Sequence, residues 1–193
     1  SELLRAMCCK RMGDGGSRLT FSTLFLRLLH VEPCAPVRGS TIGIWTRLEH
    51  IRSQYFRHGV AVVDDALVPE VWASLRRCLL RSTVWFNSKN DGDGTFVARK
   101  DTLPQALFEQ VALEMGAALW AAGLPIVDLI GWHSYKVSAP GGRGVGVHSD
   151  ASAGVTADLF MTPTTANTLR STGGVRVYRA GVPAGADATA GGF

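Results

Sequence analysis

Hydrophobic side chains recur at helical spacing in three stretches of the chain. In the first, apolar residues lie three or four positions apart between residues 40 and 58, Ser40 or Thr41 can cap the start, and Gly59 is expected to end the helix. A second helix is predicted from Pro69, because proline suits the first turn. Its apolar face contains Val71, Trp72, Leu75, Cys78 and Leu79, while three arginines (Arg76, Arg77 and Arg81) are expected on its solvated face.

A third helix is predicted between Thr102 and Gly123. Thr102 and Gln105 have the spacing of a capping box, and Gly123 with Pro125 marks the end. The predicted buried stripe of this helix is Leu107, Phe108, Val111, Met115 and Leu119.

Strand signals dominate the later part of the chain. Short apolar runs predict strands at residues 60–63 and 95–99, and then at residues 126–137, 145–150, 155–161 and 175–178. Helices that are followed by strands are typical of an α+β domain. We therefore predict N-terminal helices packed on one face of a partial jelly roll, the double-stranded β-helix.

The pattern divides the chain into three regions. Residues 1–40 are uneven and rich in arginine, which is typical of an organellar targeting segment, a poorly ordered segment or a mispredicted exon. Residues 41–180 form the expected domain, with helical support over 41–125 and jelly-roll strands over 126–180. Residues 181–193 contain little besides glycine and alanine and are expected to form a tail without a core.

Composition and charge narrow the choice of partners. Among 193 residues, 46% are apolar and 19% are charged, and no apolar run approaches the ~18 residues of a membrane span. Residues 1–58 carry 9 Lys+Arg against 4 Asp+Glu, a net charge of +5, so the whole-chain value of +4 leaves −1 for residues 59–193. We therefore expect neither a nucleic-acid partner nor a membrane partner for the predicted domain.

The four cysteines are Cys8, Cys9, Cys34 and Cys78, and their spacing includes no C-x-x-C motif. Neither a zinc site nor a disulfide framework is indicated, so we expect an intracellular, reducing compartment. Cys78 is interpreted as a small apolar residue on a helix face.

One pair of residues carries candidate metal chemistry. His148 and Asp150 lie two positions apart in a predicted strand, so their side chains share a face and can hold one cation. They supply two of the three ligands of a 2-His-1-carboxylate iron(II) site. No histidine follows His148. The alternative is a His–Asp pair at a strand end that is joined only by a hydrogen bond.

Several motifs around this pair resemble a known family. They are Trp132-His-Ser-Tyr-Lys-Val137, Val145-Gly-Val-His-Ser-Asp150, Thr162-Pro163, Ala166-Asn167 and Gly173-Gly174-Val175, with His58-Gly-Val-Ala-Val-Val-Asp64 and Ser82-Thr-Val-Trp-Phe86 upstream. Together they resemble the catalytic jelly roll of iron(II)- and 2-oxoglutarate-dependent oxygenases, the superfamily that includes prolyl 4-hydroxylases. The resemblance covers residues 56–178.

The resemblance implies a dioxygenase of the hydroxylase type. His148 and Asp150 match the proximal iron ligands, and Tyr135 lies where such enzymes often place a tyrosine against 2-oxoglutarate. The implied cofactors are Fe(II) and 2-oxoglutarate, with ascorbate as a candidate reductant. The resemblance leaves two substrate classes open, a protein side chain and a small molecule. The alternative function is a non-catalytic jelly-roll module for binding or structural support.

The family's distal histidine, and the basic residue that pairs with the 2-oxoglutarate carboxylate, would fall on later strands that this sequence does not contain. Arg176 and Arg179 lie too early to match that basic residue. His133 is a candidate substitute for the third ligand if its strand lies beside the one that carries His148 and Asp150. Against this, the register is not fixed, and His133 is expected to point to the same side as Tyr135, two positions later. We therefore expect an incomplete chain that is inactive by itself. His148 and Asp150 are expected to face the inside of the sheet, in a concave site lined by Tyr135.

Overall fold

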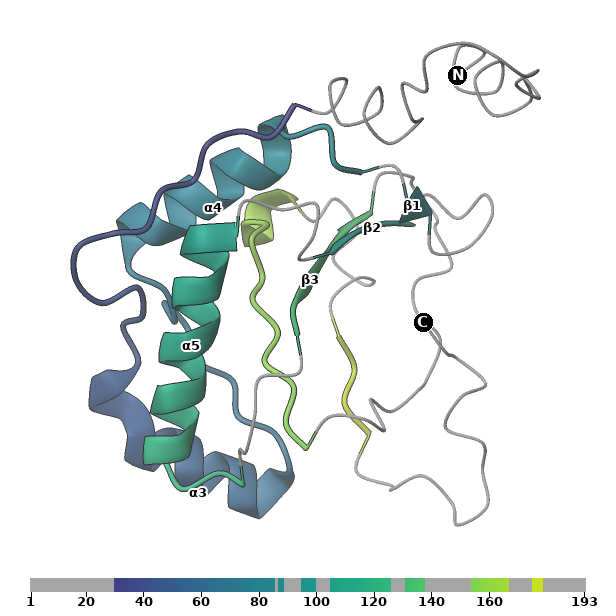
Figure 1. Ribbon diagram of the computed structural model, residues 1–193. Helices are drawn as coiled ribbons and strands as arrows, with labels where there is room; N and C mark the ends of the chain where they lie inside the picture. Colours follow the sequence, from purple (N-terminus) through teal and green to yellow (C-terminus); the bar gives the residue numbers. More distant parts are fainter. Residues whose placement is uncertain are drawn as a thin grey trace, which may run out of the picture.

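The chain folds into a mixed helix and strand structure, seen here in a computed structural model. The structure describes residues 30–85, 87–88, 95–99, 105–125, 131–137, 154–166 and 175–178. Within these ranges lie three α-helices, two short 3-10 helices and one antiparallel three-stranded sheet (Figure 1). The helices gather on one side and the sheet on the other.

Helix α3 (Leu48–His58) follows the 3-10 turn η1 (Trp45–Arg47). The predicted end is confirmed, because Gly59 adopts a left-handed φ of 73° and its N–H donates to the Tyr55 carbonyl at 2.7 Å. The predicted cap is wrong. No side chain caps η1 or α3, and the hydroxyl of Ser40 instead donates to the carboxylate of Glu114.

Helix α4 (Pro69–Arg81) confirms the second predicted helix. Its buried face consists of Val71, Leu75 and Cys78, spaced three or four residues apart as an amphipathic helix requires. The arginines depart from the prediction of a purely solvated face. The Arg76 guanidinium lies 5.6 Å from the centre of the Trp72 ring, and Arg77 and Arg81 face Glu32.

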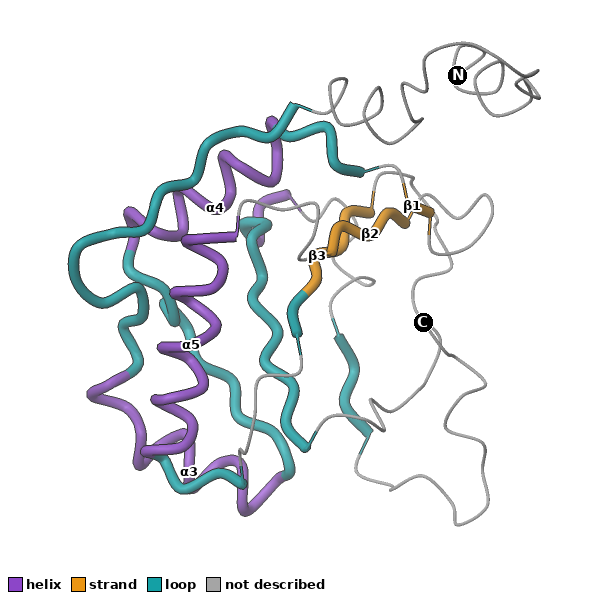
Figure 2. The backbone as a smooth tube through the Cα atoms, in the orientation of Figure 1, coloured by secondary structure: helices purple, strands orange, loops and turns teal. Residues whose placement is uncertain are grey.

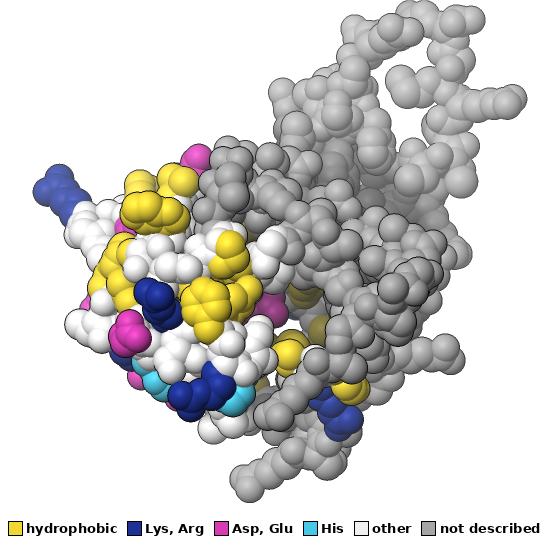
Figure 3. All heavy atoms as spheres, turned by 90° about the horizontal axis from the view of Figure 1, so that it is seen from below, with side chains coloured by type: hydrophobic (Ala, Val, Ile, Leu, Met, Phe, Trp, Pro, Cys, Tyr) yellow, Lys and Arg dark blue, Asp and Glu magenta, His cyan; other side chains and the backbone are white. Residues whose placement is uncertain are grey.

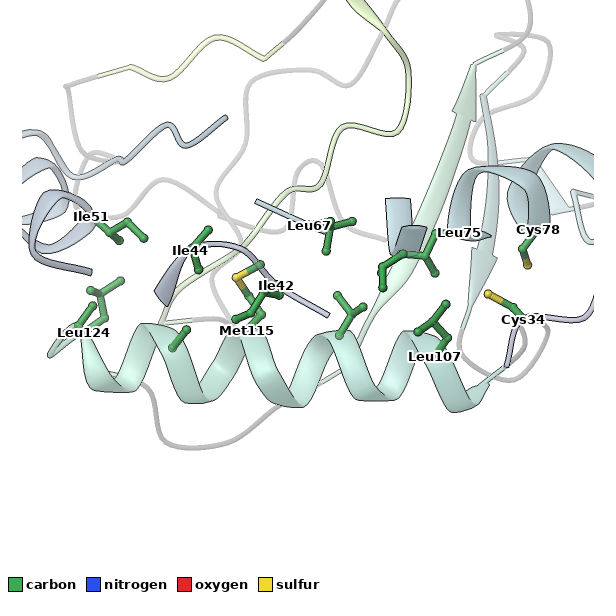
Figure 4. Packing of buried hydrophobic residues seen from close by; sticks show 14 residues of the cluster. Cys34, Ile42, Ile44, Ile51, Leu67, Leu75, Cys78, Leu107, Met115 and Leu124 are labelled. Atoms are coloured by element: carbon green, nitrogen blue, oxygen red, sulfur yellow. The ribbon is translucent and has the colours of Figure 1, made fainter. Parts of the chain in front are cut away.

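Helix α5 (Gln105–Ala121) is the central element of the core. Leu107, Val111 and Met115 are buried as predicted, whereas Phe108 and Leu119 are only partly buried against the same cluster. The predicted end is confirmed, since Gly123 has a φ of 80° and donates to the Trp120 carbonyl. Figure 4 shows the core side chains arranged along α5.

The core also contains loop residues that precede α3 and α4. Ile42 and Leu67 form an isolated antiparallel bridge, and both are buried beside Ile44. This bridge joins the loop before α3 to the loop before α4. A strand was predicted at residues 60–63, which lie between α3 and Leu67. That prediction is wrong, because residues 60–63 are irregular and Val62 is 73% exposed.

An extended segment, residues 30–40, packs across the helices and is called the strap below (Figure 1). The predicted domain starts only at residue 41, because residues 1–40 are uneven and rich in arginine. Its backbone N–H groups at His30 and Glu32 donate to the Thr83 and Ser82 hydroxyls after α4, at 2.8 and 3.0 Å. Cys34 inserts into the main core, so the strap belongs to the fold.

The other end of the strap is held by α5. Gln110 accepts a hydrogen bond from the Val37 N–H at 3.0 Å, and Glu114 accepts from the Thr41 N–H at 2.7 Å and the Ser40 hydroxyl at 2.8 Å. Burial acts to raise the pKa of Glu114. The hydrogen bonds to its charged form prevail, and the pKa of this carboxyl is lowered from its ordinary value.

The sheet consists of β1 (Asn87–Ser88), β2 (Thr95–Arg99) and β3 (His133–Val137), in that order and antiparallel. The strand at residues 95–99 is confirmed, and β3 is the described end of the strand predicted at 126–137. Residues 155–161 and 175–178 were expected to be strands, but they form no ladder (Figure 2). Val155, Leu159 and Met161 instead lie against the main core.

Charged and apolar side chains intermix on the described part of the surface in Figure 3. No helix in the described ranges has both the length and the apolar character needed to cross a membrane.

Candidate functional site

Of the predicted site residues, Tyr135 lies in the described part of the chain, whereas His148 and Asp150 do not. Residues 138–153, which include His148 and Asp150, lie outside the described residues. Tyr135 lies within them, at the middle of β3, where its backbone pairs with Val97 of β2. The described part of the candidate site is therefore strand β3 and its neighbours.

The two faces of β3 differ in exposure. Alternate residues point to opposite sides of a strand. His133, Tyr135 and Val137 form the exposed face, whereas Ser134 and Lys136 form the half-buried face. Tyr135 is 39% exposed and Val137 is 63% exposed. A small second core lies on the half-buried side. It consists of Val84 and Ala98, with Leu79, Trp85, Phe108 and Trp132 packed against them.

Aromatic residues position the half-buried face. The Trp132 side chain packs against Val84 and Ala98, and the ammonium of Lys136 lies 5.8 Å from the centre of the Trp85 ring. Trp85 is itself held by a 2.8 Å hydrogen bond from its indole N–H to the Leu79 carbonyl at the end of α4. These contacts turn the face that carries Tyr135 away from the helices.

His133 and Tyr135 are neighbours on the exposed face. Their ring centres are 4.8 Å apart with an interplanar angle of 79°, an edge-to-face contact that restrains both side chains. The expectation that His133 and Tyr135 share a strand face is thus confirmed. An imidazole and a phenol placed side by side provide nitrogen and oxygen groups that can hydrogen-bond a carboxylate.

A hollow of about 310 Å³ lies elsewhere, beside α3. It is lined by Gln54, His58, Val60, Val62 and Val177. Since Tyr135 is not among its lining residues, this hollow is not the predicted concave site. Arg176 belongs to the neighbouring exposed segment 175–178. Within the described part of the chain, no three His, Cys, Asp or Glu side chains gather into a group suited to a metal ion.

A pair of thiols that the sequence did not predict lies between the strap and α4. Cys34 on the strap and Cys78 on α4 meet in the core, where they are 6% and 0% exposed. No spacing motif could indicate this contact, because the two cysteines are far apart in the sequence. The hydroxyl of Ser74 lies 3.7 Å from the Cys34 sulfur, and that of Ser82 lies 3.8 Å from the Cys78 sulfur.

The two thiols differ in acidity. The neighbouring Cys78 thiol lowers the pKa of Cys34 to about 7, against the effect of burial, and Ser74 and the positive charge of Arg77 act in the same direction as Cys78. The same contact with Cys34, together with burial, raises the pKa of Cys78. The pair is therefore asymmetric, with Cys34 as the thiol that ionises first.

Comparison of the chain with protein-family models, with curated proteins and with solved structures finds no significant match.

Proposed function

We propose that this chain carries an iron(II)- and 2-oxoglutarate-dependent dioxygenase site of the hydroxylase type, on a jelly-roll sheet whose described part is β1–β3. The observation that supports this proposal best is the orientation of β3. Tyr135 and His133 lie on the face turned away from the helices, where a jelly roll with helices on its other face places its ligand pocket.

The donor set fits the proposed cofactors. His148 and Asp150 would hold the metal through a nitrogen and a carboxylate, the ligand types that non-haem iron(II) takes. The Tyr135 hydroxyl would donate a hydrogen bond to a carboxylate of 2-oxoglutarate, and the edge-to-face contact with His133 would keep the phenol in place. Bound iron would supply the activation of oxygen that couples decarboxylation of 2-oxoglutarate to oxidation of a substrate.

The third ligand is not assigned. With His148 and Asp150 alone, iron binding would be weak, and we expect no succinate from this chain above a control without protein. The proposal can therefore be tested more sharply by binding than by turnover.

The test is binding of radiolabelled 2-oxoglutarate in equilibrium dialysis without oxygen, with and without Fe(II). We expect iron-dependent binding that Tyr135→Phe weakens about tenfold, the loss expected for one hydrogen bond to a charged group. Tyr55→Phe is the matched control, because Tyr55 lies on α3 beside Phe56 and should leave binding unchanged.

Three results would count against the proposal. Binding of 2-oxoglutarate that does not depend on iron would contradict the iron site, and binding that Tyr55→Phe weakens as much as Tyr135→Phe does would remove Tyr135 from the site. No binding at all would favour the alternative, a non-catalytic jelly-roll module in which His148 and Asp150 only hydrogen-bond each other.

A further inference from the structure

The contact between the strap and α4 contains two thiol groups that packing alone does not require. Two apolar side chains would fill the same volume, yet two thiols meet there, each with a serine hydroxyl beside it. Figure 4 shows the sulfur atoms of Cys34 and Cys78 near each other at one end of the core, beyond Leu107. Both cysteines belong to the same buried cluster, and each thiol influences the pKa of the other.

The charged groups around the pair also have defined positions. Glu32 lies two residues before Cys34. Its Oε1 is 3.7 Å from the Arg77 Nε and 3.7 Å from the Arg81 Nη1, and its Oε2 is 3.4 Å from the His30 Nε2. Arg77 directly precedes Cys78 in α4 and favours the thiolate of Cys34. These ion pairs and the hydrogen bonds to Thr83 and Ser82 hold the strap against α4.

The surroundings of Cys34 allow a small oxidant to reach it. The neighbouring strap residues Pro33, Ala35 and Pro36 are exposed, and Cys34 itself is 6% exposed, so Cys34 lies at the edge of the core. The strap has no regular secondary structure, and such segments open locally at a smaller cost than helices do. Cys78 lies deeper, on α4.

We infer that Cys34 and Cys78 form a redox site, in which a hydroperoxide oxidises the two thiols to a reversible disulfide between the strap and α4. The Cys34 thiolate attacks the terminal peroxide oxygen, the O–O bond breaks, and Cys34 becomes a sulfenic acid while the leaving oxygen takes up a proton. The Cys78 sulfur then attacks the Cys34 sulfur, its proton leaves with the sulfenic hydroxyl as water, and the S–S bond forms. With hydrogen peroxide the balance is two thiols and one peroxide giving one disulfide and two waters.

Reversal needs a dithiol, which reduces the disulfide by exchange and is itself oxidised. The positions of the two thiols set their roles. Cys34 lies on the irregular strap between exposed residues and is the attacking thiol, a role that its lowered pKa favours. Cys78 is fully buried on α4 and is the resolving thiol.

The test treats the full chain with hydrogen peroxide and maps tryptic peptides by mass spectrometry without reduction. We expect a linked pair of peptides, 28–38 with 78–81, lighter by two hydrogen atoms than the sum of the two and separated again by dithiothreitol. Cys8 and Cys9 fall in a different peptide, 6–10, which reports any competing bridge.

Two variants test the order of steps with dimedone, a trap for sulfenic acids. Cys78→Ser should give dimedone-labelled Cys34, whereas Cys34→Ser should leave Cys78 unlabelled. The inference is overturned if peptides 28–38 and 78–81 stay unlinked at a peroxide concentration that oxidises Cys8 or Cys9. It is also overturned if Cys78 is labelled as readily as Cys34. The wild-type result does not depend on whether either variant folds.

Discussion

The helical side and the sheet side of the molecule are held together differently. On the helical side, α4, α5 and the loops before α3 and α4 share one core, whose most deeply buried side chains include Ile42, Leu75 and Leu107. On the sheet side, β3 packs one face on a small aromatic cluster and exposes the other. The difference indicates that most of the buried core is supplied by the helices, the strap and their loops, whereas β3 contributes to packing through one face only.

The largest expected effect comes from the helical core. Leu107→Ala should lower the free energy of unfolding by about 2 to 5 kcal/mol, because it leaves a cavity at a fully buried position on α5. Phe160→Ala is the counterpart in the segment that was expected to be a strand. It should cost less than about 0.5 kcal/mol, since Phe160 is 63% exposed. Denaturation by urea, followed by circular dichroism, measures both.

Equal losses of stability for Leu107→Ala and Phe160→Ala would contradict the burial of these two positions, one inside the helical core and the other at the surface. A large loss for Phe160→Ala alone would mean that Phe160 packs against the main core as its neighbours Val155, Leu159 and Met161 do.

A smaller effect is expected at the link between strap and α5. Glu114→Gln should lower the free energy of unfolding by about 1 kcal/mol at neutral pH, because the hydrogen bonds from Ser40 and Thr41 lose their ionised acceptor. The folded-state pKa of Glu114 lies below its ordinary value, so its contribution is fully present above the unfolded pKa. It is lost as the pH falls through the lower folded value.

Urea unfolding of the wild type and of Glu114→Gln at several pH values between neutral and acidic gives this profile. The gap between the two proteins should narrow in acid, below the ordinary pKa of glutamate. A gap that widens in acid would show that the ionised carboxylate does not hold the strap.

The helices were predictable because their information is local. Gly59 and Gly123 end α3 and α5, and Pro69 opens α4, as the sequence indicates. The strap was not predictable, since Pro33 and Pro36 interrupt any period and its partners lie on α4 and α5. Cys34 and Cys78 meet through that long-range packing, so their spacing carries no signal.

Within the described ranges, a strand prediction is confirmed where a partner strand lies alongside. The strand at 95–99 pairs with β3, whereas the apolar run at 60–63 has no ladder. Apolar alternation shows that a segment can form a strand, but the pairing depends on distant residues. For the site, strand parity correctly placed His133 and Tyr135 on one face. The assignment of His148 and Asp150 to iron stays a prediction.

Binding of Fe(II) to the whole chain tests the proposed site most directly, measured without oxygen by equilibrium dialysis at several iron concentrations. We expect one weakly held iron per chain, with binding lost in both His148→Ala and Asp150→Ala. His58→Ala, which changes an exposed histidine at the end of α3, should bind like the wild type. Iron binding that persists in His148→Ala and Asp150→Ala, or that falls equally in His58→Ala, would contradict the proposed iron site.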